Sequence, residues 1–388
     1  MSKNAKNKRT NAAVIDGKFY PLVSVCTPTY NRRPFLKHMF QCFLNQTYPR
    51  NRMEWIIVDD GTDRVKDVID DIDIPQIKYF EVKQKMTLGQ KRNYMHSKCN
   101  GAIIVYMDDD DYYPPERVEH AVDMLTANPD ALCAGSSEIY IYFKHISQMF
   151  QFGPYGPTHA TAGTFAFKRE LLNMTKYDES ASLAEEKAFL KDYTIPFVQL
   201  DPFKTILVFS HIHNTFDKKR LLENRDPTYC KESTVPISRF IKNDSEKSLL
   251  QFFMNDIDKL LEDYVYGYPV YKPDVIRQMK QLEDERNKMQ LDHFKQMQEK
   301  NITITNKETG DTMTVEDLIG KYNEIMNENQ MLKHRINELN QFIEQFTGQG
   351  PVKISPPVQA PPAPVLPKVF ESDIKIVPKV KPTISLMD

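Results

Sequence analysis

The chain has 388 residues, enough for two or three structural units, since domains usually contain roughly 100 to 200 residues. Its 51 basic and 53 acidic residues give a net charge of -2, so no global basic field favours nucleic acid or an anionic membrane. The five cysteines include no C-x-x-C pair, which favours reduced thiols over a disulfide framework or a zinc site. No apolar run approaches the roughly 18 residues of a membrane span, and we expect a cytoplasmic protein.

The first half of the chain alternates apolar, strand-like runs with helical segments. The runs LVSVCT, EWIIVDD, IKYFEV and AIIVYMD occupy residues 22–27, 54–60, 77–82 and 102–108. Helical segments follow the first and third runs, at residues 34–46 and 89–99. This alternation predicts a mostly parallel sheet flanked by helices, to which later apolar runs at residues 132–143, 160–167 and 204–213 could add strands. We expect an α/β domain over residues 20–235.

The remaining segments differ from this domain in composition. We expect a disordered basic N-terminus, a helical connector, a hairpin-like insert, a coiled coil and a disordered Pro-rich tail, at residues 1–19, 236–300, 301–316, 317–347 and 348–388. The tail holds 9 of the 25 prolines and few large apolar residues, so we expect it to act as a spacer.

A strict heptad pattern near the C-terminus predicts a coiled coil. Large side chains recur at alternating separations of four and three residues, at Leu318, Tyr322, Ile325, Asn329, Leu332, Ile336, Leu339, Ile343 and Phe346. Asn329 falls at an a position, where a buried asparagine favours a two-stranded parallel coil. We therefore expect a homodimer, the alternative being that this helix packs on its own globular domain.

Four consecutive aspartates, Asp108 to Asp111, end the fourth strand-like run. In extended chain, residues two apart point the same way, so Asp108 and Asp110 could converge on one point, with Asp109 and Asp111 as the alternative pair. Paired carboxylates hold Mn²⁺ or Mg²⁺ and leave positions open for phosphate oxygens. No G-x-x-x-x-G-K-[ST] loop precedes them, which excludes a P-loop ATPase.

The segments VSVCTPTYNRR, IIVDDGTD, GQKRN and YMDDDDYYPPE, in this order and at these spacings, resemble the family 2 glycosyltransferases of GT-A fold. The resemblance covers residues 21–215. It implies a metal-dependent transfer of a sugar from a nucleoside diphosphate sugar, most simply a UDP-sugar, to the hydroxyl of an unknown acceptor. It also implies inversion at the anomeric carbon.

The resemblance assigns roles to residues after the first three strands. Thr27, Pro28 and Tyr30 would cradle the nucleoside. Asp60 or its neighbour Asp59 would accept a hydrogen bond from the uracil imide, and Arg92 would approach the base or the diphosphate.

Further residues would hold the metal and take the acceptor proton. The family's metal motif matches Asp108, Asp110 and Asp111, with Asp110 as the best direct ligand. His211, in HIHNTF, would be an additional ligand. Glu185 and Glu186 stand where the family has a Glu-Asp pair, a departure that makes a glutamate the general base, with Glu186 preferred.

Two other classes of function compete with this interpretation. A nucleotidylyltransferase would need a glycine-rich phosphate loop after the first strand, whereas TPTYNRR contains no glycine. A structural assembly protein could use the coiled coil and the Pro-rich tail and carry an inactive α/β domain. The intact set of candidate ligands favours the enzyme.

Overall fold

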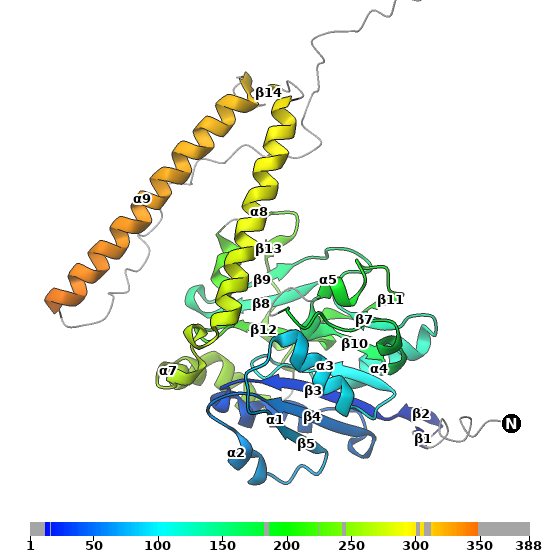
Figure 1. Ribbon diagram of the computed structural model, residues 1–388. Coiled ribbons are helices and arrows are strands. Elements are labelled where there is room, and N and C mark those ends of the chain that lie inside the picture. Colours follow the sequence, from blue (N-terminus) through cyan, green and yellow to red (C-terminus); the bar gives the residue numbers. More distant parts are fainter. Residues whose placement is uncertain are drawn as a thin grey trace, which may run out of the picture. The chain divides into compact units, whose positions relative to one another are not determined.

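The computed structural model describes residues 12–15, 17–181, 186–223, 225–242, 246–299, 303–305 and 312–347. The chain divides into two compact units, Met1–Lys280 and Gln281–Asp388. Figure 1 shows their helices and strands. Among the described residues, no helix is long and apolar enough to cross a membrane.

A seven-stranded sheet forms the centre of the first unit, in the order β11-β7-β10-β6-β3-β4-β5 (Figure 1). Its four parallel neighbours are β6 (Ile103–Tyr106), β3 (Val23–Thr29), β4 (Met53–Asp59) and β5 (Ile77–Glu81). The short strands β10 (Ala166–Lys168), β7 (Cys133–Gly135) and β11 (Phe197–Gln199) complete it, with β10 antiparallel to both neighbours. The expected α/β class with a mostly parallel sheet is confirmed.

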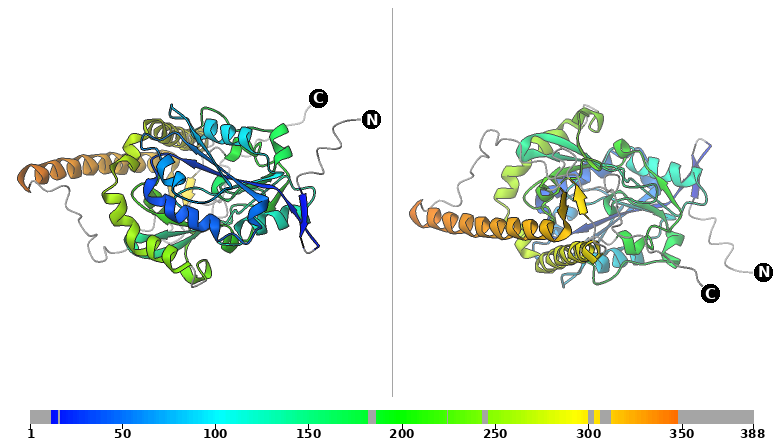
Figure 2. Two further views of the ribbon diagram at one scale, coloured as in Figure 1. Left: turned by 90° about the horizontal axis from the view of Figure 1, so that it is seen from below. Right: turned by 90° about the horizontal axis from the view of Figure 1, so that it is seen from above.

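Successive residues of β4 point to opposite faces of this sheet, as the pleat requires. Trp55 belongs to the core on one face, where the ring of Phe43 from α1 (Leu36–Leu44) stacks on it at 4.3 Å. Ile56 belongs to the core on the other face, together with Met95 of α3 (Leu88–Lys98). Helices α1 and α3 therefore cover opposite faces of the sheet (Figure 2).

Two further helices pack on the α1 face. Val118 of α4 (Arg117–Ala127) and Ile69 of α2 (Lys66–Asp70) are buried in the same core as Trp55. The short helix α5 (Glu186–Phe189) contributes Phe189 to the opposite core.

The later apolar runs divide between two sheets, contrary to the single sheet expected. Strands β8 (Ile139–Phe143) and β12 (Leu207–Ser210) join β9 (Gln148–Phe152) and β13 (Cys230–Glu232) in a separate four-stranded sheet of order β12-β8-β9-β13. Their side chains are apolar enough for either sheet, and only the partners available in three dimensions decide between them.

Regular structure begins closer to the N-terminus than expected. β1 (Ala12–Ile15) pairs antiparallel with β2 (Lys18–Pro21) around Gly17, which has a φ of +79°. The ammonium of Lys18 lies 2.9 Å from carboxylate oxygens of Glu119 and Asp123 on α4. Expecting disorder up to residue 19 was therefore wrong for this hairpin; residues 1–11 lie outside the described residues.

The first unit also continues beyond residue 235, where the domain was expected to end. A nearly continuous helical segment follows, made of α6 (Lys247–Gln251), the π-helical turn η11 (Phe252–Asp256) and α7 (Ile257–Glu262). Phe253 stacks on Phe209 of β12 at 4.5 Å, and Phe252 packs edge-on against Phe35 at 6.3 Å. Burial of these aromatic rings makes the segment part of the core rather than a connector.

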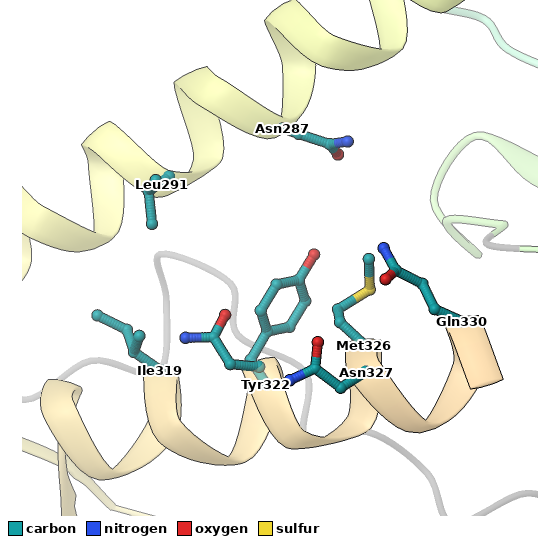
Figure 3. A pocket seen from close by; sticks show the side chains of 8 residues that line it. Asn287, Leu291, Ile319, Tyr322, Met326, Asn327 and Gln330 are labelled. Carbon is teal, nitrogen blue, oxygen red and sulfur yellow. The ribbon is translucent and has the colours of Figure 1, made fainter.

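Helix α8 (Pro273–Glu299) leads from the first unit into the second, where the hairpin β14 (Thr303–Thr305) and β15 (Thr312–Thr314) precedes α9 (Val315–Thr347). Within the second unit, a cavity of about 490 Å³ separates Leu291 of α8 from Ile319, Tyr322 and Met326 of α9 (Figure 3). Several side chains of the heptad pattern, which we call the heptad stripe, are solvent-exposed. Ile325, for example, exposes 50% of its surface. The residues of the Pro-rich tail lie outside the described part of the chain.

All five cysteines are unpaired as disulfides and buried. The sulfur atoms of Cys26 on β3 and Cys99 after α3 lie 3.4 Å apart, a non-bonded contact between thiols. This agrees with the reduced state inferred from their spacing.

Candidate active site

The carboxyl ends of three neighbouring strands place the candidate residues at one edge of the sheet. Thr29, the last residue of β3, pairs with Asp59 of β4, and Cys26 pairs with Tyr106 at the end of β6. The loops that follow these strands therefore start side by side. This edge is where open α/β sheets bind their ligands.

The two carboxylates that end β4 have different environments. Asp59 accepts hydrogen bonds from the backbone N–H of Gly61 at 2.8 Å and from the hydroxyl of Tyr79 at 2.7 Å. Asp59 therefore stabilises the conformation of the loop that follows β4. Asp60 accepts from the backbone N–H of Met86 at 2.6 Å and forms a buried ion pair with Lys91.

Lys91 is a residue of this edge that the sequence interpretation missed. Besides its ion pair with Asp60, its ammonium donates to the backbone carbonyl of Thr29 at 3.1 Å. Arg92, which was expected to approach the base or the diphosphate, instead packs its guanidinium 4.3 Å from the ring centroid of Tyr106. Consecutive helical residues are rotated by about 100°, so only one of the two can face Asp60.

The three residues expected to cradle a nucleoside lie along β3 and just after it. The hydroxyl of Thr27 is buried in the sheet, where it donates to the carbonyl of Met107 at 2.6 Å and accepts from the indole N–H of Trp55 at 2.9 Å. Pro28 is partly exposed. The half-buried ring of Tyr30 stands at the edge, with the ammonium of Lys91 5.7 Å from its centroid. Of the three residues, Tyr30 is the one whose ring lies at this edge of the sheet, where a base could stack on it.

The aspartate cluster follows β6 as a bend rather than as extended chain. Asp109, Asp110 and Asp111 lie in this bend, so the strand alternation used to pair Asp108 with Asp110 does not apply to them. Asp110 is held by Arg32, whose Nη2 donates to its Oδ2 at 3.1 Å, and its Oδ2 lies 3.4 Å from Nε2 of His211.

Arg32 links the loops after β3 and β6. Besides Asp110, its guanidinium lies 3.4 Å from Asp109 and donates to the backbone carbonyl of His213 at 2.7 Å. The side chain is almost completely buried. The sequence interpretation did not single it out, although it stands in the quoted TPTYNRR segment.

Burial and the Arg32 charge give the aspartates different proton affinities. Burial raises the pKa of Asp109 to about 7, against the opposing charge of Arg32. Burial also acts on Asp110, but the charge of Arg32 and the hydrogen bond from His211 hold the pKa of that carboxyl well below its ordinary value. Burial raises the pKa of Asp111 well above the ordinary value. The cluster therefore favours additional positive charge.

The donor set fits a hard divalent cation. Oδ1 of Asp111 is buried without a hydrogen-bond partner among the described residues, and carboxylate oxygens are the ligands that Mg²⁺ and Mn²⁺ prefer. In the described part of the chain, no three His, Cys, Asp or Glu side chains already converge on one point. A bound cation would therefore draw the carboxylates of this bend together.

Glu186 contacts the turn that packs on Asp108. Its carboxylate accepts from the backbone N–H of Ala162 at 3.1 Å, in the short helix η5 (Ala162–Thr164). The next residue, Gly163, packs so closely on Asp108 that an added Cβ would lie 3.0 Å from Oδ2. The two acidic residues thus contact neighbouring positions of one turn. Glu185 lies outside the described residues.

Comparison with known proteins shows which family this part of the chain resembles. Residues 24–177 match the model of the family described as Glycosyl transferase family 2. An uncharacterized glycosyltransferase of Rickettsia conorii is 32% identical over 129 residues, which are 31% of this chain and 20% of that protein. The putative teichuronic acid biosynthesis glycosyltransferase TuaG of Bacillus subtilis is 29% identical over 109 residues, 27% of this chain and 42% of that protein. The chain spans less than half the length of these relatives.

Solved structures show a more distant likeness. S. aureus TarS 1-349 in complex with UDP-GlcNAc shares 18% identity, with a TM-score of 0.40, over 48% of this chain and 58% of that chain. The mannosyltransferase PcManGT from Pyrobaculum calidifontis, in complex with GDP-Man and Mn²⁺, shares 19% identity, with a TM-score of 0.40, over 53% and 62%.

The match of residues 24–177 to the family model, together with the acidic bend after the central strand of the sheet, supports the resemblance to glycosyl transferase family 2. The family resemblance stated from the four sequence segments is confirmed.

Proposed function

We propose that the chain transfers a sugar from a nucleoside diphosphate sugar, most simply a UDP-sugar, to an acceptor hydroxyl. The observation that carries this proposal is that Asp60, Asp110 and Glu186 all lie near the carboxyl edge of one sheet, whose parallel strands fall in the segment that matches the family 2 model. In this proposal Asp60 binds the nucleoside, Asp110 helps to hold the cation at the diphosphate, and Glu186 takes the proton of the acceptor.

Tyr30 and Asp60 bind the nucleoside in this proposal. The ring of Tyr30 offers a stacking surface, and the Asp60 carboxylate, which is paired with Lys91, accepts from an imide N–H. A relative whose structure contains UDP-GlcNAc and another that contains GDP-Man make UDP and GDP the first nucleotides to test.

The aspartate bend and His211 hold Mn²⁺ or Mg²⁺ in this proposal. When bound, the cation supplies positive charge that stabilises the departing diphosphate. Arg32 keeps Asp110 ionised and fixes its orientation, while Asp108 and Asp111 provide further oxygen ligands.

Glu186 takes the proton of the acceptor hydroxyl, and attack from the face opposite the diphosphate inverts the anomeric carbon. The backbone N–H of Ala162 fixes one carboxylate oxygen and leaves the other for the acceptor. Glu185, its neighbour in sequence, is the alternative base.

The heptad stripe of α9 supports a homodimer. Tyr322, Ile325, Leu332, Ile336 and Leu339 are each between 42% and 56% exposed within one chain. Such a row of apolar side chains is stabilised when a second helix covers it, at about 1.5 to 3 kcal/mol for each large side chain that becomes buried.

The function is tested by measuring hydrolysis and transfer with purified protein, a panel of UDP- and GDP-sugars, and Mn²⁺ or EDTA. We expect slow, metal-dependent hydrolysis of one donor even without an acceptor. The rival function, a coiled-coil assembly protein with an inactive domain, predicts neither nucleotide binding nor hydrolysis with any of these donors. Release of a nucleoside monophosphate together with a sugar phosphate would instead indicate pyrophosphatase chemistry.

A further inference from the structure

A segment far along the chain from the family 2 motifs crosses the candidate donor edge. We call residues 264–274 the strap; they belong to the same compact unit as the sheet. The hydroxyl of Tyr264 donates to Asp63 at 2.6 Å, after β4. Closer to α8, Asp274 forms an ion pair of 2.6 Å with Lys85, after β5.

Backbone carbonyls of the strap contact the loop after β3. The amide of Asn31 donates to the carbonyl of Tyr266 at 3.0 Å, and the hydroxyl of Tyr30 donates to the carbonyl of Tyr271 at 3.1 Å. The strap therefore touches the loops after three parallel strands, at the edge where we place the nucleoside.

A glycine fixes the path of the strap over the His211–His213 turn. Gly267 packs on the imidazole of His213, and an added Cβ would lie 2.3 Å from its Nδ1. The ring of Tyr268 packs edge-on against the same imidazole at 4.8 Å. Only a residue without a side chain can hold this position unless the ring or the strap moves.

This path brings the ammonium of Lys272 into the site. The side chain is 94% buried, with 6% of its surface exposed. Nζ donates to the hydroxyl of Thr215 at 2.8 Å and lies 5.9 Å from the ring centroid of Tyr30. Burial and the neighbouring charge of Arg32 hold the pKa of Lys272 well below its ordinary value, against the opposing charges of Asp109 and Asp110. Lys272 therefore lies between the proposed nucleoside cradle and the aspartate bend.

A buried ammonium at this position needs an anionic partner. Removing a charge from water costs several kcal/mol unless hydrogen bonds and opposite charge compensate. Within the described residues, its hydrogen bond goes to a neutral hydroxyl, although an ammonium has three donors. Asp109 and Asp110 already share the charge of Arg32. A diphosphate would bring the missing oxygen acceptors to the same place.

We infer that Lys272 binds the β-phosphate in the diphosphate of the nucleotide donor, so that the strap is part of the donor site. The inference rests on the proposed function and deepens it. It assigns a donor contact to a residue outside the segment that matches the family model.

The experiment compares UDP and UMP, which differ by the group that Lys272 would contact. Calorimetric titration of the full-length protein with each nucleotide, in Mn²⁺, is repeated for Lys272→Met. We expect UDP to bind about tenfold or more weakly, because a charge-assisted hydrogen bond is lost, while UMP changes by less than about threefold. Lys272→Arg should retain most of the UDP affinity.

Two further variants separate a specific contact from general damage. Lys259→Met, at an exposed position of α7, should bind both nucleotides like the wild type. Gly267→Ala leaves Lys272 intact but displaces the strap, and we expect it to lose UDP affinity as Lys272→Met does. Thermal unfolding of each variant shows whether the fold is retained.

Three outcomes contradict the inference. Equal weakening of UDP and UMP in Lys272→Met would mean that the residue acts on the nucleoside or on the fold. Tighter UDP binding would mean that the ammonium is an internal counter-ion that competes with the ligand. If the wild type binds neither UDP nor GDP, the proposed function fails, and the assignment of Lys272 fails with it.

Discussion

Nε2 of His211 lies 3.4 Å from Oδ2 of Asp110, although the two residues are 101 positions apart in the chain. Burial lowers the pKa of His211 to about 3, so the imidazole is neutral at pH 7 and can act as a metal ligand. The ring also packs against Phe35 at 5.0 Å, which fixes its orientation. Histidine and carboxylate thus face one point from two different loops.

The first prediction concerns this pair. Asp110→Ala should reduce transfer by at least about 100-fold and abolish Mn²⁺-dependent UDP binding, because the diphosphate loses its electrostatic partner. Initial rates and calorimetry measure the two effects. Asp130→Ala, at an exposed position after α4, is the matched control and should behave like the wild type. Full activity of Asp110→Ala would refute the metal site.

The second prediction separates catalysis from donor binding. Glu186→Gln should lower turnover by roughly 10² to 10⁴ with little change in UDP affinity, because a general base acts in the transition state. Steady-state kinetics with saturating donor tests this. Glu170→Gln, at an exposed position, serves as control. If Glu186→Gln and Glu185→Gln both turn over normally, the base lies elsewhere.

The third prediction concerns stability in acid. His96 is buried beside Tyr106, with Nε2 2.6 Å from the hydroxyl, and burial lowers its pKa to about 3. The unfolded chain takes up this proton below about pH 6.5, so the contribution of His96 to stability is complete above that pH and is lost as the pH falls toward 3. The loss is about 1.4 kcal/mol per pH unit.

Urea unfolding of wild type and His96→Gln at pH 7.5 and 5.0 measures this contribution. The free energy of unfolding should fall between the two pH values by about 2 kcal/mol less in the variant than in the wild type. Because the other buried histidines are unchanged, their effect cancels in the comparison. An identical fall in both proteins would show that His96 is protonated in the folded state.

The fourth prediction concerns α9. A chain that ends after Glu299 should be a monomer that still hydrolyses the donor, because the proposed catalytic residues and the strap precede that point. Asn329→Ile in the full-length chain should raise the thermal stability of the coil and loosen its preference for two strands. Light scattering gives the oligomeric state. A full-length protein that is monomeric would contradict the dimer.

The parallel half of the sheet could be predicted because its strands lie in strand-like runs that alternate with helical segments. The run at residues 132–143 predicted a strand, but not its division into β7 and β8 in two different sheets. The three-residue strand β11 was not predicted, because so short a segment has no periodicity of its own. The π-helical turn at Phe252 likewise depends on the aromatic core that it enters.

The sequence predicted the site residues that directly follow strands. It did not predict those whose position depends on the rotation of a helix or on a contact between distant parts of the chain. Lys91 and Arg92 are adjacent cations on one helix, and both are buried, so the sequence does not show which of them meets Asp60. Lys272 lies more than 150 residues beyond the aspartates, and nothing local in the strap indicates where it folds back.

The burial of every native thiol makes this chain suited to cross-linking with an introduced cysteine. Under native conditions the five sulfur atoms should react slowly with disulfide-forming reagents. A parallel in-register coil places the two copies of position 339 opposite each other, so Leu339→Cys should join the subunits rapidly on mild oxidation. Because position 339 lies away from the middle of α9, an antiparallel pair would separate its two copies along the axis and leave the subunits unjoined, so one gel distinguishes the two directions of assembly.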